Sequence, residues 1–116
     1  MNPKTETRIL KVYLSSTDKF ENEPLFETLV FIAKKNKMSG ATVIKGVMGY
    51  GASSAVTSTR FWEVSEKLPM IVEIIDEKEK IENFISIIKP ILEKVKKGIM
   101  VSVEKTTVVM YKSGGK

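Results

Sequence analysis

Hydrophobic and polar positions alternate along residues 8–14, which predicts a strand that is covered on one face. The side expected to face the core carries Leu10, Val12 and Leu14, and the other side carries Ile9, Lys11 and Tyr13. Pro24 suits an early helical position, where its missing N–H is not needed, and an apolar face follows at helical spacing: Phe26, Leu29, Val30 and Ala33. We expect this helix to end near Asn36. Residues 41–48 are β-rich and predict a second strand, in which Gly46 indicates a bulge or a close backbone approach.

The second half of the chain repeats this order. Residues 69–75 are apolar apart from Glu73 and predict a central strand that begins at a proline. Asp76 and Glu79 resemble a capping box, ahead of a helical stripe: Ile81, Phe84, Ile85, Ile88, Leu92 and Val95. Pro90 should kink this helix or split off its last turn, and Gly98 should cap its C-terminus. Residues 99–103 alternate as a strand, and residues 106–111 form a further β-prone run.

This order predicts an α+β fold of the ferredoxin-like split βαβ type. An antiparallel sheet would carry two helices on one face and an extra C-terminal strand. We expect one domain over residues 1–116, with flexible tails at 1–7 and 112–116 and a long functional loop at 49–68. The uncovered sheet face would be apolar, which usually marks oligomerisation, and it would include Ile9, Tyr13, Ile71 and Ile75.

Composition narrows the function. The chain has no cysteine and no histidine, so disulfides, thiolate ligands and the usual general base are absent, and we expect no enzyme. The first residues are polar and no run of about 18 apolar residues occurs, so we expect a cytoplasmic protein. The net charge of +5 suits phosphates, RNA or anionic lipid without choosing among them. Abundant Lys and Glu, with no Gln, are typical of thermophile proteins.

Glycines cluster around the predicted exit of the second strand. Residues 39–43 read Ser-Gly-Ala-Thr-Val, and residues 45–51 read Lys-Gly-Val-Met-Gly-Tyr-Gly. Glycine lets backbone N–H groups approach an anion or a flat base, so a ligand cradle is one interpretation. A bulge at Gly46 with a turn at residues 49–51 is the other, and the spacing alone leaves both open.

These motifs resemble the PII signalling proteins, in which a Gly-x-Thr-Val strand leads to Gly-Phe-Gly at the base of a long loop. The resemblance continues through Leu-Pro-x-x-x-Glu at residues 68–73 and Lys-Gly-Ile-Met-Val-Ser at residues 97–102. The sequence Pro-Leu-Phe-Glu at residues 24–27 is closer to the uncharacterised bacterial PII-like branch. In element order the resemblance covers residues 8–109.

The resemblance implies a homotrimer that binds an adenine nucleotide (ADP, AMP or ATP) without a metal, in clefts between subunits. The long loop would report occupancy to a regulated protein, for which a transporter is one candidate. The nucleotide-binding residues implied are Ala41, Thr42, Gly49, Tyr50, Gly51, Ala52, Lys97, Gly98, Ile99 and Lys112. The family's phosphate-clamping arginines have no counterpart in residues 108–111, where Lys105 or Lys112 could substitute as point charges, so the phosphate number stays open.

Two other features leave alternatives open. Arg60, Phe61 and Trp62 in the long loop suit a partner-contact surface, or the two aromatic residues anchor the loop onto the body. Lysines at the ends of both predicted helices are explained by the helix dipole, and only Lys97 beside Gly98 is a ligand candidate. An RNA-binding module is the alternative function, although residues 99–103 lack the aromatic pattern that such modules use.

Overall fold

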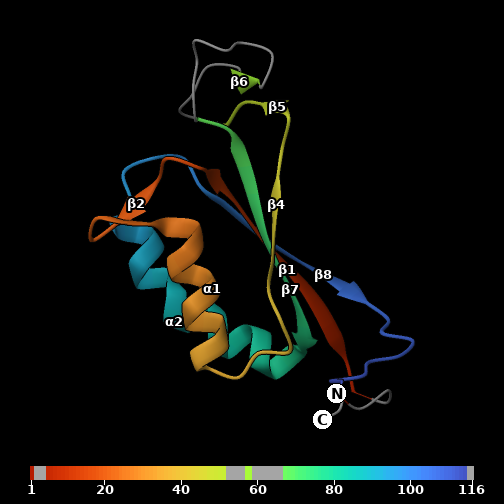
Figure 1. The fold of residues 1–116 in the computed structure, drawn as a ribbon. Coiled ribbons are helices and arrows are strands. Elements are labelled where there is room, and N and C mark those ends of the chain that lie inside the picture. Colours follow the sequence, from red (N-terminus) through yellow and green to blue (C-terminus); the bar gives the residue numbers. More distant parts are fainter. Residues whose placement is uncertain (2–4, 52–56, 59–66, 115–116) are drawn as a thin grey trace.

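The strand predicted at residues 8–14 is β1 (Thr7–Ser15), and its predicted core side is buried: Leu10, Val12 and Leu14. The computed structural model describes residue 1 and residues 5–51, 57–58 and 67–114. β1 pairs on one side with β7 (Pro69–Glu77) and on the other with β8 (Met100–Thr106). β4 (Thr42–Lys45) completes the antiparallel sheet, whose strand order is β4-β7-β1-β8. This is the predicted ferredoxin-like arrangement (Figure 1).

Two helices cover one face of the sheet (Figure 1). α1 (Leu25–Lys35) ends before Asn36, as predicted, but Pro24 precedes the helix as its N-cap residue instead of lying in its first turn. The helix buries Leu25, Leu29 and Ala33. α2 (Lys78–Lys94) buries Ile81, Phe84 and Ile88 on its predicted stripe. These side chains meet Leu10, Val12, Val72 and Ile74 of β1 and β7 in one core. Within the described residues, neither helix is long and apolar enough to cross a membrane.

A short hairpin precedes α1 where the sequence predicted only a polar stretch. β2 (Lys19–Phe20) pairs with β3 (Glu23–Pro24). The two turn residues, Glu21 and Asn22, have positive φ values of 51° and 68°. A type I′ turn, which is common in two-residue hairpins, needs positive φ at both residues, and its backbone follows the twist of the strands. The Glu-Asn pair is a weak signal for such a turn, which is why the hairpin was missed.

The predicted ends of α2 were wrong. Glu77 is the N-cap residue and makes no side-chain capping bond, so Asp76 and Glu79 form no capping box. Gly98 is not the C-terminal cap, because the helix ends at Lys94 and Val95 turns its side chain back onto the core. The helix also continues through Pro90 without splitting off its last turn. Proline removes only one ladder hydrogen bond, and its neighbours in the ladder hold the helix together.

Asp76 is a buried tether rather than a cap. Only 3% of this residue is exposed, and its carboxylate accepts hydrogen bonds from the N–H groups of Ser39 (2.8 Å) and Glu77 (2.7 Å). Lys80 lies 3.6 Å from the same carboxylate. The Ser39 hydroxyl also donates to the carbonyl of Ile75. Asp76 therefore ties the connection between α1 and β4 to the start of α2.

The second and last strands differ from their predicted lengths. The predicted strand at residues 41–48 is divided into β4 and β5 (Met48–Gly49), and β5 pairs with β6 (Thr57–Ser58). The extra strand predicted at residues 106–111 was wrong, since the described residues after Thr106 form no strand. Thr106 already lies opposite Thr7, where β1 begins, so the chain beyond it has no strand to pair with. It runs instead to the connection between α1 and β4, where the Tyr111 hydroxyl donates to the carbonyl of Ser39 (3.1 Å).

We predict that Asp76→Ala lowers the free energy of unfolding by about 1–3 kcal/mol, because it leaves two partly buried N–H groups without their acceptor. Urea denaturation at a fixed protein concentration measures this change. Glu79→Ala is the control, because Glu79 is exposed on the same helical turn and should cost less than about 0.5 kcal/mol. Equal losses in the two variants would contradict the tether and favour a capping box.

Candidate functional site

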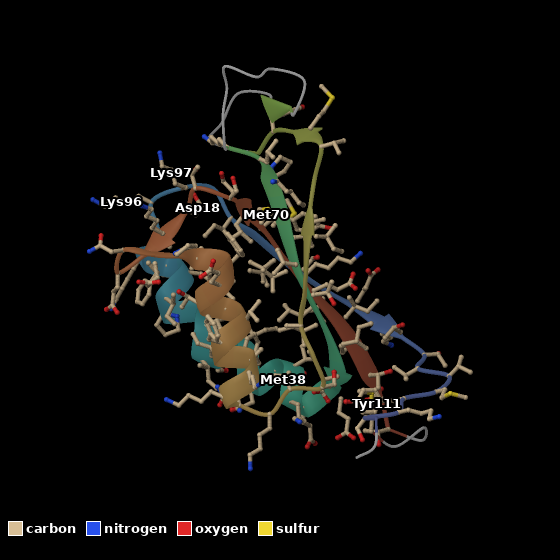
Figure 2. The ribbon with its side chains drawn as sticks, viewed as in Figure 1. Asp18, Met38, Met70, Lys96, Lys97 and Tyr111 are labelled. Atoms are coloured by element: carbon tan, nitrogen blue, oxygen red, sulfur yellow. The ribbon has the colours of Figure 1, made fainter. Side chains whose placement is uncertain are left out.

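A pocket of about 420 Å³ lies where the long loop joins the sheet. Four segments line it: the turn after β1, the glycine-rich stretch after β4, the start of β7, and the connection from α2 to β8. Figure 2 shows Asp18, Met70 and Lys97 from three of these segments at the same end of the molecule. The lining residues of these segments are Leu14, Ser15, Thr17, Asp18, Gly46, Met48, Gly49, Tyr50, Gly51, Lys67, Leu68, Pro69, Met70, Ile71, Lys97, Gly98, Ile99 and Met100, with Tyr13 of β1.

Gly46 holds two of these segments together. Its N–H donates to the carbonyl of Pro69 over 2.7 Å, and a Cβ atom at this position would lie 2.8 Å from the Pro69 ring. Only glycine permits such an approach without a shift. The close backbone approach predicted from the sequence is therefore confirmed. A Cβ at Gly49 would lie 3.3 Å from the same ring, so both glycines pack against Pro69.

The turn after β1 forms a polar wall of the pocket. Asp18 is only 4% exposed, and its carboxylate accepts a hydrogen bond from the Ser15 N–H (2.9 Å). Its own carbonyl accepts the N–H of Leu25, the first residue of α1 (2.8 Å). These bonds fix the turn between the strand and the helix. Ser15, Thr17 and Asp18 thus present hydroxyls and a carboxylate at a fixed place in the pocket.

The other walls combine apolar side chains with two ammonium groups. Met70, Ile71 and Ile99 supply apolar surface, and Lys67 and Lys97 supply positive charge. In the part of the lining that the structure describes, two lysines and the carboxylate of Asp18 leave one excess positive charge. Such a mixture suits a ligand that has a flat apolar part and an anionic part.

The structure brings together six of the predicted nucleotide-binding residues: Gly49, Tyr50, Gly51, Lys97, Gly98 and Ile99. Three others lie apart from the pocket within one chain. Ala41 packs against the core, Thr42 is exposed on β4, and Lys112 is exposed in the C-terminal segment. Ala52 and the predicted partner-contact residues Arg60, Phe61 and Trp62 lie outside the described residues.

Sequence reasoning missed part of the lining. Ser15, Thr17 and Asp18 belong to the polar stretch after β1, and Lys67 precedes the third predicted strand. A polar stretch directly after a strand was a usable signal, because the ends of neighbouring strands meet at one edge of the sheet. No local sequence pattern shows which strand ends are neighbours. The polar stretch could therefore be assigned to the pocket only once the order of the strands in the sheet was known.

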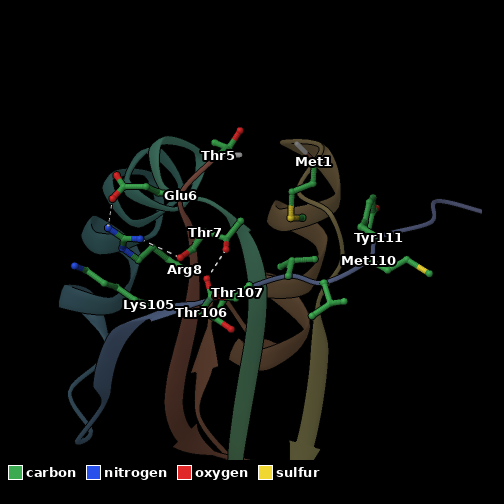
Figure 3. A pocket seen from close by; sticks show the side chains of 12 residues that line it. Met1, Thr5, Glu6, Thr7, Arg8, Lys105, Thr106, Thr107, Met110 and Tyr111 are labelled. Atoms are coloured by element: carbon green, nitrogen blue, oxygen red, sulfur yellow. Dashed lines mark hydrogen bonds and ion pairs between the residues drawn. The ribbon is translucent and has the colours of Figure 1, made fainter. Parts of the chain in front are cut away.

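A second, smaller pocket of about 290 Å³ lies at the other end of the sheet, where β1 begins and β8 ends (Figure 3). Arg8 and Lys105 stand on one side of it and Met110 and Tyr111 on the other. The Arg8 guanidinium lies 3.7 Å from the Glu6 carboxylate and donates to the Thr7 carbonyl (3.0 Å). Its charge is therefore already engaged by its own chain.

The sheet face opposite the helices is open. Strand register places Ile44, Ile71, Tyr13 and Met100 in one row across it, and Thr42, Glu73, Lys11 and Ser102 in the next. Tyr13 is 37% exposed and Met100 is 64% exposed. The face therefore carries the apolar residues predicted for it, divided by a charged row.

Lys11 is the positive centre of that charged row. Its ammonium lies 3.3 Å from the Glu104 carboxylate on β8. The hydrogen bond to Glu104 raises the pKa of Lys11 above its ordinary value, and the charges of Glu104, Tyr13 and Glu73 add to the effect. Lys11 therefore stays positively charged between strands β7 and β8.

The fold matches solved structures of CPII, a nitrogen regulatory PII-like protein from Thiomonas intermedia K12. The structure bound to ADP and bicarbonate has a TM-score of 0.60 and 12% sequence identity, over 89% of this chain and 90% of that one. The structure bound to ADP, AMP and acetate has a TM-score of 0.57 and 12% identity, over 90% and 91%. At this identity the likeness shows the fold alone, and that fold agrees with the one that the resemblance in the motifs implies.

Sequence comparison gives the family. The model of DUF190, described as an uncharacterized ACR, matches residues 7–108. A UPF0166 protein of Aquifex aeolicus is 35% identical over 82 residues, which are 71% of this chain and 78% of that protein. A UPF0166 protein of Methanocaldococcus jannaschii is 41% identical over 76 residues, which are 66% and 69%. The chain belongs to the DUF190 (UPF0166) family.

We predict that Gly46→Ala destabilises the protein by about 1–3 kcal/mol, because the new methyl group overlaps the Pro69 ring and forces the backbones apart. Gly40→Ala is the matched control. A Cβ at Gly40 meets nothing within 4 Å, so this variant should change stability by less than about 1 kcal/mol. Thermal unfolding of both variants at one protein concentration measures the difference, and equal midpoints would contradict the close approach.

Proposed function

We propose that this protein is a PII-like regulatory protein of the cytoplasm that binds an adenine nucleotide and reports the bound state through its long loop. The observation that carries the proposal is that both ends of that loop line one pocket: Gly49–Gly51 at its start and Lys67–Leu68 at its finish. A ligand in the pocket would touch both ends at once. Its binding free energy could therefore act directly on the loop and on a partner protein that contacts it.

The chemistry of the pocket supports an adenine nucleotide. Its volume of about 420 Å³ lies in the ordinary range for small-molecule sites. Apolar side chains and glycine backbone suit a flat base, and Lys67 and Lys97 suit phosphate oxygens. The CPII structures are described as bound to ADP and AMP, which favours the same ligand class here.

The charge of the pocket supports a mono- or diphosphate ahead of a triphosphate. Among the described residues, the pocket is lined by two lysines and no arginine, and Asp18 offsets part of their charge. Lysine acts as a point charge and lacks the bidentate grip of arginine on phosphate oxygens. A third phosphate would therefore have to be neutralised from outside this chain, for example by Lys105 or Lys112 of another copy.

We further propose a homotrimer in which nucleotide clefts lie between subunits. The open sheet face carries a row of apolar side chains that water would otherwise contact: Ile44, Ile71, Tyr13 and Met100. Thr42 also lies apart from the pocket of its own chain. It would join a nucleotide site only where a neighbouring copy brings β4 close to that site.

Other functional classes have less support. RNA-recognition modules on this fold stack bases on several aromatic residues of the sheet, whereas β7 and β8 carry none and β1 carries only Tyr13. An enzyme would have to work without histidine or cysteine, and the described residues contain no group of three acidic side chains placed for a metal ion. A regulated partner, such as a transporter, would be recognised through the loop, where Arg60, Phe61 and Trp62 are candidate contacts.

We predict that calorimetric titration with AMP, ADP and ATP detects binding of at least one nucleotide, without ATP hydrolysis. Lys97→Ala should weaken this binding by about tenfold, because it removes a charged hydrogen-bond donor to phosphate. Lys89→Ala is the control, since Lys89 is exposed on α2 and does not line the pocket. Absence of heat with all three nucleotides would refute the proposal, and salt-sensitive binding of single-stranded RNA would favour the alternative module.

We predict that light scattering gives a mass three times that of one chain, and that Ile75→Lys shifts it toward the monomer. Ile75 lies half-buried on the open face beside Ile9, so a buried interface there would have to accept an unpaired charge. Phe31→Lys is the control, because Phe31 is 68% exposed on α1 and lies on the other side of the molecule. A monomeric wild-type protein would remove the proposed clefts between subunits.

A further inference from the structure

The end of the long loop is held to the turn after β1 by two reciprocal hydrogen bonds. The Ser16 N–H donates to the carbonyl of Leu68 over 2.8 Å. The Leu68 N–H in turn donates to the Ser16 hydroxyl over 2.9 Å. Leu68 is only 5% exposed, so its amide has little access to water in place of this hydroxyl. Ser16 is thus the acceptor that fixes the last residue before β7.

The turn that contains Ser16 is itself rigid. The Asp18 carboxylate accepts the Ser15 N–H, the Asp18 N–H donates to the Ser15 carbonyl (3.1 Å), and the Asp18 carbonyl accepts the Leu25 N–H at the start of α1. Through Ser16, the end of the loop is therefore bonded to a turn that is anchored in both β1 and α1. The loop end cannot move away from this body without breaking the Ser16 bonds.

Ser16 occupies a particular place relative to the pocket. Its neighbours Ser15 and Thr17 line the pocket, and so does its partner Leu68, whereas Ser16 does not. A ligand in the pocket would contact the turn on one side and Lys67–Pro69 on another. The hydroxyl of Ser16 joins these two walls through its hydrogen bond with the Leu68 N–H, although Ser16 does not itself line the pocket. A substitution at Ser16 can therefore alter how the walls are connected without removing a group that faces the ligand.

We propose that Ser16 is the positioning residue that couples occupancy of the pocket to the end of the long loop. This inference rests on the proposed function, because it needs a ligand in that pocket. A ligand that touches both walls favours the arrangement in which turn and loop end are hydrogen-bonded. By linkage, the same hydrogen bonds favour the ligand. Without the hydroxyl, the pocket keeps its lining groups, but its loop-side wall is held by one bond fewer.

Hydrogen exchange at the amides of Lys67, Leu68 and Met70, measured with and without a saturating concentration of the nucleotide that calorimetry shows to bind, tests the coupling. In the wild-type protein, nucleotide should slow exchange at Leu68 by about tenfold, as expected when binding opposes local opening. Ser16→Ala should raise exchange at Leu68 in the absence of nucleotide by about fivefold and abolish most of the slowing by nucleotide. Ser16→Thr keeps a hydroxyl and should restore both properties.

Ser86→Ala is the matched control. The Ser86 hydroxyl donates to the Glu82 carbonyl within α2, away from the pocket, so its loss should leave exchange at Lys67, Leu68 and Met70 unchanged. Slowing by nucleotide that is as large in Ser16→Ala as in the wild-type protein would overturn the coupling. So would a wild-type protein that binds nucleotide with no change at Leu68, a result that does not depend on whether the variant folds.

Calorimetry on the wild-type protein separates the two proposals. If it shows nucleotide binding and the exchange experiment shows no coupling, the proposed function stands and the role of Ser16 fails. If it shows no binding of AMP, ADP or ATP, the proposed function fails, and the coupling to a ligand fails with it.

Discussion

The close approach of Gly46 to Pro69 is the contact on which the rest of the site depends. β7 lies between β4 and β1 in the sheet, and Pro69 is its first residue. Because Gly46 lies against this residue, the chain leaves β4 where it later enters β7. The two ends of the long loop are thereby neighbours, and whatever fills the space between them contacts both. A side chain at position 46 would separate the ends, since there is no room for a Cβ beside the proline ring.

The distribution of charge gives this junction its chemical character. Most lysines of the chain lie on exposed surfaces and at helix ends, where they are solvated and favoured by the helix dipole. Lys67 and Lys97 differ because they also line the pocket, beside apolar side chains and glycine backbone. Asp18 faces the same pocket from the turn. The site therefore combines attraction for a modest negative charge with an acceptor for ligand donors.

The sheet leaves one face and its edge strand β8 exposed in the single chain. Helices cover one face, and the core lies between them and strands β1 and β7. β8 is exposed on both sides: Val101 and Val103, which share the side of Val12 and Leu10, are 40% and 44% exposed, and Met100 on the other side is 64% exposed. Association with other copies would cover this strand and the apolar row. The ion pair of Lys11 and Glu104 lies in the same region and would help to set the register of such an assembly.

The sequence by itself determined the long strands and the two helices, together with the sides that they bury. Alternation in β1 and helical spacing in α1 and α2 predicted the core, because the period of a pattern reports which face meets the protein interior. Gly46 and the Gly-Tyr-Gly stretch also indicated half of the pocket. Only the tertiary structure decided that Ser15, Thr17 and Asp18 complete it, that Asp76 turns inward to bind Ser39, and that residues after Thr106 find no strand to pair with. These outcomes depend on which strand ends become neighbours and where a partner strand stops. Such contacts join residues far apart in the chain, and no local pattern records them.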